Sequence, residues 1–118
     1  MAYDADQVEA LLQGRAAQRA TFSYSELLLL LGHNFSRPRM RALCVVLDAI
    51  DARAEAAGQP ELAALVVREG DDLPGQGWWM GRGDYAGAFE GASARKYLLT
   101  VQRQAFDYWQ GRALNTPV

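Results

Sequence analysis

The side chains best suited to bind an anion are polar and basic residues gathered in one short stretch: His33, Asn34, Ser36, Arg37, Arg39 and Arg41. Arginine donates in a planar fork to phosphate, and it can also read guanine in the major groove of DNA. No acidic residue lies between Glu26 and Asp48. This stretch therefore predicts contact with a nucleic acid, although three arginines near a helix start also occur as a solvated charged face.

The elements around this stretch predict a helix-turn-helix, which is a short helix, a tight turn and a longer amphipathic helix. Ser23 and Glu26 form a capping-box pattern, so a first helix should begin there and end at Gly32. Ser36 can cap a second helix. Apolar residues then recur every 3.6 residues or so as far as Gly58, which predicts one buried face along that helix.

The remaining segments predict a wing and two flanking helices. Before the helix-turn-helix, an N-terminal helix is expected over residues 4–19, capped by Asp6. After the wing, a last helix is expected from Ser93 to about residue 110. The apolar run at residues 62–67 and the pair Trp78–Trp79 fit two strands of a hairpin joined by a glycine-rich turn. Arg68, on the first of these strands, is a weaker candidate for DNA contact.

Together these segments predict an α+β fold of the winged-helix type. It has three N-terminal helices, a small β-hairpin wing and a C-terminal helix. We expect one domain over residues 1–118, with a core at 4–110 and a frayed tail at 112–118.

Composition narrows the possible functions. The net charge of −2 is unlike that of a strongly basic nucleic-acid binder, so any DNA affinity must come from a local patch. One His and one Cys are too few ligands for a zinc site, and we predict no metal and no cofactor. Cys44 lies on the apolar stripe and is expected inside. No apolar run is long enough to span a membrane, so a cytoplasmic protein without membrane contact is expected.

Laid end to end, residues 22 to about 102 resemble the winged-helix DNA-binding domain of alkylguanine-DNA alkyltransferases and alkyltransferase-like proteins. The segment Ser23-Tyr24-Ser25 is similar to the Thr/Ser-Tyr-Gly start of a helix in that family, and Gly32 matches its end. The resemblance implies that Tyr24 presses on a target phosphate and that Arg39 takes the space of a flipped base. Helical geometry instead favours Arg41 for the groove, because it lies farthest from the apolar stripe.

The match has departures. Near the C-terminus, Tyr85-Ala86-Gly87-Ala88 lacks the second Gly of the family's Tyr-x-Gly-Gly, and the lysine spacing before Leu98-Leu99 is one residue short. The Pro-Cys-His-Arg active site would fall on Pro60-Glu61-Leu62-Ala63, so the nucleophile is missing and alkyl transfer is not expected. Short motifs at residues 24–27, 60–67 and 73–77 are also similar to small bacterial domains, some of which accompany restriction-type nucleases.

These observations predict a non-catalytic protein that binds duplex DNA with a recognition helix starting near Ser36. A protein-interaction or dimerisation module of the same fold is the alternative. That module would use the exposed member of the pair Trp78–Trp79 and the aromatic face of the last helix to bind a protein partner or a second copy.

Overall fold

The structure, a computed structural model, describes residues 3–80 and 82–114, with the side chain of Leu114 left out. Four longer helices form its frame: α1 (Ala5–Ala17), α2 (Tyr24–Leu30), α3 (Arg37–Ala56) and α5 (Gly91–Leu114). Shorter elements lie between them: strand β1 (Phe22–Ser23), the 3-10 turn η1 (Ala63–Leu65), strand β2 (Val66–Val67) and helix α4 (Gln76–Trp79). The fold is therefore α+β, as predicted, with helices predominating.

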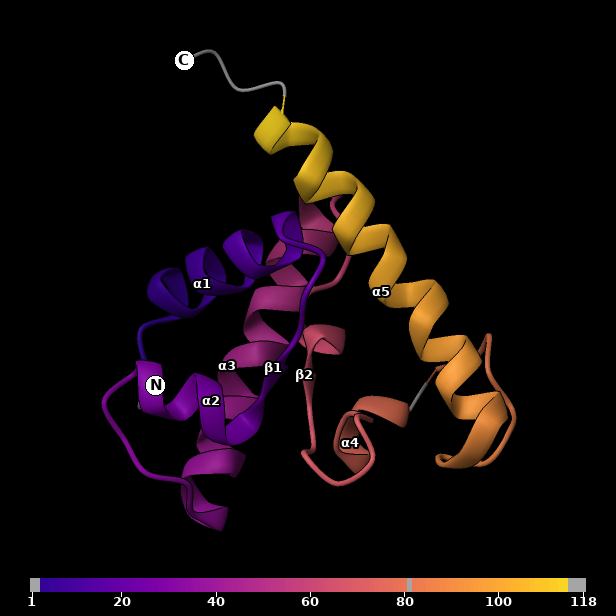
Figure 1. Cartoon of the computed structure of the whole chain (residues 1–118), viewed down its shortest axis with the longest axis horizontal. Helices are drawn as coiled ribbons and strands as arrows, with labels where there is room; N and C mark the ends of the chain where they lie inside the picture. Colours follow the sequence, from indigo (N-terminus) through magenta and orange to yellow (C-terminus); the bar gives the residue numbers. More distant parts are fainter. Residues whose placement is uncertain (1–2, 81, 115–118) are drawn as a thin grey trace.

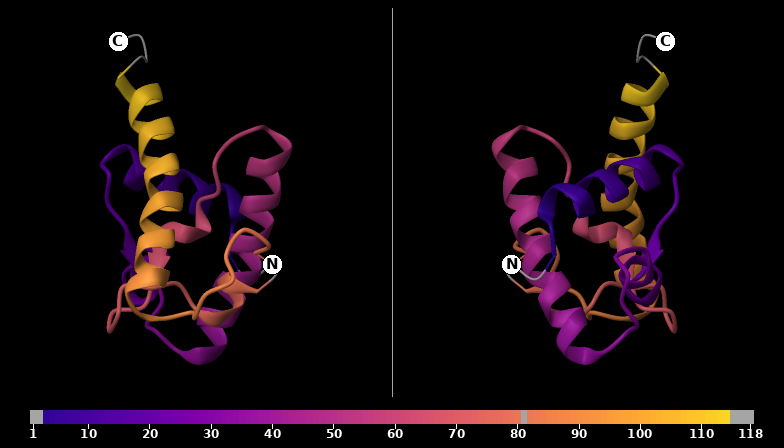
Figure 2. Two further views of the ribbon diagram at one scale, coloured as in Figure 1. Left: turned by 90° about the vertical axis from the view of Figure 1, so that its right-hand side faces the viewer. Right: turned by 90° about the vertical axis from the view of Figure 1, so that its left-hand side faces the viewer.

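Helices α3 and α5 occupy two sides of the molecule, and the short strands pass between them (Figure 1). Helix α1 packs against both α5 and α3, and the side views show it crossing between them (Figure 2). One buried cluster lies among α1, α2 and α3, and it includes Leu12, Leu28 and Leu43. A second cluster joins β2 and α4 to α5 through Val67, Trp79 and Leu98.

The sheet differs from the predicted hairpin. Strand β1 pairs with β2 in parallel, with Phe22 opposite Val66 and Ser23 opposite Val67. The apolar run at 62–67 thus forms a 3-10 turn and a two-residue strand rather than one strand of a wing. A parallel pair cannot be closed by a tight turn, so the two strands come from segments far apart in the chain.

The second predicted wing strand is also wrong. Trp78 and Trp79 lie in helix α4, which begins after Gly75. Trp79 is buried, and Trp78 is half-buried with its indole nitrogen donating to a Glu61 carboxylate oxygen at 3.0 Å. One tryptophan in the core and the other half covered agrees with the prediction for this pair, although Trp78 is not fully exposed. Aromatic rings from the α4–α5 connection and from α5 cover them.

Several predicted helix ends are confirmed. The Ser23 hydroxyl accepts from the Glu26 amide, and the Glu26 carboxylate accepts from the Ser23 amide, which completes the capping box. The Ser36 hydroxyl accepts from the Arg39 amide at the start of α3. Gly32 has a φ of 90°, the left-handed conformation in which glycine ends a helix without strain.

Other ends were misplaced. Asp4, not Asp6, caps α1. Helix α5 begins at Gly91, two residues before Ser93, and continues to Leu114, so residues 112–114 of the predicted frayed tail are helical. Residues 115–118 of that tail fall outside the described residues. Within the part of the chain that the structure describes, no helix has both the length and the apolar character needed to cross a membrane.

Candidate nucleic-acid interface

The connection between α2 and α3 forms a closed turn ahead of the recognition helix that we predicted. The amides of Gly32 and His33 donate to the carbonyls of Leu29 and Leu28, which is the Schellman pattern at a helix end. His33, Asn34 and Phe35 then follow as exposed residues. This connection leads the chain to the protruding start of α3 (Figure 1).

Arg37 and Arg41 lie on the solvent face of the first two turns of α3. They are four residues apart, so their side chains lie on the same face of the helix. Both are exposed, and neither makes a hydrogen bond or an ion pair with the described residues. The first turn of α3 contains no acidic residue. The two positive charges are therefore available to a partner.

Arg39 behaves differently from its neighbours. Its guanidinium donates to the carbonyl oxygen of Asn34 at 2.9 Å and so ties α3 back to the preceding connection. His33 lies edge-on to the ring of Tyr3, with 5.5 Å between the ring centroids. The predicted cluster is brought together at one end of α3, but Arg39, His33 and the capping Ser36 also hold local structure.

Most other arginines are already engaged. Five of them form ion pairs: Arg15 with Glu26, Arg19 with Asp107, Arg53 with Asp6, Arg68 with Asp71, and Arg82 with Glu61. Arg68, the weaker candidate, binds both oxygens of Asp71, at 3.2 and 2.7 Å. It lines a shallow depression with Phe35 and Met40, close to the α2–α3 connection but separate from Arg37 and Arg41.

Tyr24 does not lie on the surface with the arginines. Its side chain is buried, and its hydroxyl accepts from the Gly75 amide at 3.0 Å. Burial is the main reason that the pKa of Tyr24 rises to about 12. Contact with a phosphate would require this residue to leave the core, so the role implied by the resemblance does not fit its position.

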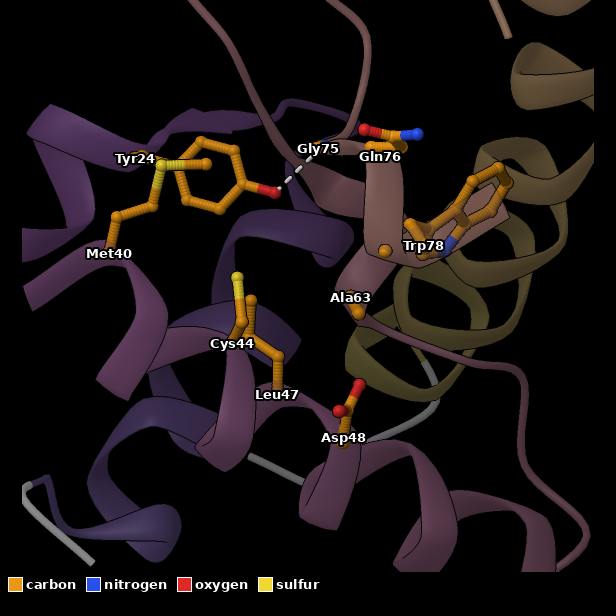
Figure 3. Close-up of a pocket in the computed structure, with 10 residues that line it drawn as sticks. Tyr24, Met40, Cys44, Leu47, Asp48, Ala63, Gly75, Gln76 and Trp78 are labelled. Carbon is orange, nitrogen blue, oxygen red and sulfur yellow. Dashed lines mark hydrogen bonds between the residues drawn. The ribbon is translucent and has the colours of Figure 1, made fainter. Parts of the chain in front are cut away.

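A cavity beside α3 was not anticipated. It measures about 170 Å³ and lies between α3, η1 and α4 (Figure 3). Met40, Cys44 and Asp48 line it from α3, and their four-residue spacing could have indicated a shared face. Cys44 is half-buried rather than fully inside, and burial raises the pKa of its thiol, which opposes a reactive thiolate.

A second feature missed from the sequence is a charged junction of four side chains: Glu61, Trp78, Arg82 and Tyr97. The Arg82 guanidinium donates to both Glu61 oxygens, at 2.9 and 2.6 Å, and to the Tyr97 hydroxyl at 2.9 Å. It also lies 3.9 Å from the centroid of the Trp78 ring. Tyr97 and Glu61 lie 15 and 21 residues from Arg82, so only the fold could bring them to the Trp78–Arg82 segment.

Among the described residues, no three His, Cys, Asp or Glu side chains are grouped so that they could hold a metal ion. We found no protein-family model, curated protein or solved structure that matches this chain. The resemblance to alkyltransferases, the DNA-binding function and the absence of catalysis therefore stay predictions.

Proposed function

We propose that this chain binds duplex DNA, without catalysing a reaction, through the amino-terminal end of α3. The observation that carries the proposal is the pair Arg37 and Arg41, which is exposed and unpaired while five other arginines form ion pairs. The sequence α2, turn, α3 supports a helix-turn-helix mode of binding, in which the start of the second helix approaches the groove.

Helix electrostatics support the same reading. The amino-terminal end of a helix carries partial positive charge, which favours nearby carboxylates and disfavours nearby cations. In α3 the first turn has no acidic residue and holds Arg37 and Arg39 instead. This arrangement costs a little stability in the free protein, and an anion placed there would be attracted by both the helix end and the arginines.

Individual roles follow from the contacts. Arg37 and Arg41 would neutralise phosphates, and Arg41 is the better candidate for reaching a base edge, because the Arg39 guanidinium is held by the Asn34 carbonyl. Asn34 and His33 would lie beside the backbone of the duplex. Ser36 would act through its cap, which fixes the direction in which α3 begins.

The test is binding of a labelled duplex by fluorescence anisotropy across a salt series. We expect the double variant Arg37→Ala/Arg41→Ala to bind more weakly and to flatten the slope of log affinity against log salt by about 2, since each neutralised phosphate contributes about 0.9. Arg103→Ala is the matched control, because Arg103 on α5 is also exposed and unpaired. If the native chain does not bind, or if Arg103→Ala weakens binding equally, the proposal fails.

A specific observation also favours a protein-interaction module. Large apolar side chains are exposed on the same helix pair and its connection: Leu29, Leu30, Phe35 and Val45, with exposed fractions of 60, 53, 48 and 60%. Sedimentation at several concentrations separates the two functions. A monomer that binds the duplex supports DNA binding, whereas a dimer that ignores DNA and dissociates in a Leu29→Ser/Leu30→Ser variant supports the module.

A further inference from the structure

The cavity between α3, η1 and α4 is large enough for a small organic molecule. Its volume of about 170 Å³ exceeds the space of a single water, roughly 30 Å³, but it is smaller than a drug-sized pocket. The apolar wall consists of the Tyr24 ring, the Met40 thioether, Leu47 and Ala63. A compact apolar body of one ring fits these dimensions.

The polar groups that line the cavity include an acidic side chain and no basic one. Figure 3 shows the Cys44 thiol turned toward the Tyr24 hydroxyl and the Asp48 carboxylate turned toward Ala63. The Tyr24 hydroxyl already accepts from Gly75. Asp48 makes no hydrogen bond and no ion pair with the described residues, and no basic side chain lines the cavity. The one charge facing the space is therefore negative and without a partner.

The surroundings reinforce this negative potential. Asp51 lies one turn after Asp48 on α3, and the charges of Glu61 and Asp48 add to the effect of burial in raising the pKa of Asp51. Two nearby cations are already paired, because Arg82 binds both oxygens of Glu61 and Arg68 binds both oxygens of Asp71. A positively charged group entering the cavity would therefore be favoured, and a phosphate or carboxylate would be repelled.

We propose that this cavity is a binding site for a small organic amine, whose ammonium group pairs with Asp48 and whose apolar body packs against Tyr24, Met40 and Ala63. The site is separate from the DNA surface proposed above, although both use α3. Asp48 lies two turns after Arg41, on the same side of that helix. The inference stands whether or not the chain binds DNA.

The experiment compares three probes of similar size and different charge: benzylamine, benzyl alcohol and benzoate. Amide chemical shifts are followed by NMR on the full chain. We expect benzylamine to shift the amides of Ala63, Gly75 and Gly77, with a dissociation constant on the order of 1 mM, as expected for so small a ligand. Benzyl alcohol should bind more weakly at the same place, and benzoate should not bind there.

Two variants on α3 isolate the charge. Asp48→Asn should weaken benzylamine about threefold to fivefold, the range for an exposed ion pair, and leave benzyl alcohol unchanged. Glu55→Gln is the matched control, because Glu55 is exposed on the same helix and does not line the cavity. It should leave both affinities unchanged. Added salt should weaken benzylamine binding and not benzyl alcohol binding.

A third variant tests the place of binding. Ala63→Leu should fill the cavity and abolish the binding of both probes. If that variant does not fold, the two exposed substitutions still decide the matter, since the side chains of Asp48 and Glu55 make no hydrogen bond with the described residues. The proposal is overturned if benzylamine produces no shifts at Gly75 and Gly77, if benzyl alcohol binds as tightly, or if Asp48→Asn leaves the amine affinity unchanged.

Discussion

Arg37 and Arg41 at the start of α3 are exposed and unpaired, whereas Arg82 in the charged junction has a side chain that is only 18% exposed and binds both oxygens of Glu61. The same residue type thus serves two purposes. At the junction its charge is neutralised within the protein and links α4, α5 and the segment after α3. At the start of α3 its charge remains available. The environment of each arginine, rather than the number of arginines, therefore indicates where a polyanion could bind.

Replacing Arg82 should cause the largest loss of stability, and this loss tests whether an arginine bound within the protein supports the fold. Arg82→Leu leaves the Glu61 carboxylate partly buried without its cation, so we expect the free energy of unfolding to fall by about 3 kcal/mol. Urea unfolding followed by tryptophan fluorescence measures it. Arg53→Leu is the control, because its ion pair with Asp6 is exposed to solvent and should contribute much less to stability. Equal losses in the two variants would contradict the structural role of Arg82.

A second prediction concerns Asp51, the carboxylate next to the junction. Its Oδ1 accepts from the amides of Leu62 and Ala63 at 2.8 and 3.0 Å. Burial is the main cause that raises its pKa to about 6. Since this pKa lies above the unfolded value of about 3.9, the folded state binds more protons between these pH values, and stability falls as the pH rises.

The fall expected from this one group is about 2 kcal/mol between pH 4 and pH 6, at 1.36 kcal/mol per pKa unit. Urea unfolding at several pH values measures it. Asp51→Asn has no proton to lose, so its stability should change less over the same range. A variant whose profile parallels that of the native chain would show that another group is responsible.

The third prediction separates the cap of α3 from its arginines. Ser36→Ala removes the acceptor of the Arg39 amide, and we expect a loss of about 1 kcal/mol in the free energy of unfolding. Ser93→Ala is the matched control, because Ser93 makes no hydrogen bond through its hydroxyl with the described residues and should lose less than about 0.5 kcal/mol. A null result for Ser36→Ala would mean that the cap does not fix the start of α3.

The variant that should weaken DNA binding most should have the smallest effect on stability. Arg37→Ala/Arg41→Ala removes two cations that the helix end disfavours, so stability should stay within about 0.5 kcal/mol of native or rise slightly. Thermal unfolding of the variant beside Arg103→Ala measures this change. A loss above about 1 kcal/mol would show that these arginines support the fold, and it would remove the contrast with Arg82.

Local signals in the sequence were sufficient for the α2–α3 region. The capping box at Ser23, the glycine at position 32 and the cap at Ser36 each act within four residues, so the pattern alone locates them. Because these helix ends determine where α3 begins, they also explain why the basic residues lie together. Tyr24 was misjudged, because its burial depends on Gly75, which approaches from a distant part of the chain.

Long-range packing explains the failures in the second half. Val66 and Val67 have strand-forming side chains, but their partner is Phe22–Ser23 rather than the neighbouring segment. Trp78 and Trp79 suit a strand equally well by propensity, and they form helix α4 where rings from later segments, including Phe89 and Tyr97, pack on them. Such contacts leave no periodic trace in the sequence.

One contact of the last helix bears on the order in which the chain can fold. Gln102, a buried polar residue in α5, donates from its amide nitrogen to the Ala64 carbonyl at 2.8 Å. Until α5 is present, that carbonyl and the apolar side chains beside it have no cover. During synthesis the preceding segments can form helices, but they cannot complete the core before this helix leaves the ribosome, so residues 3–114 should fold as one cooperative unit.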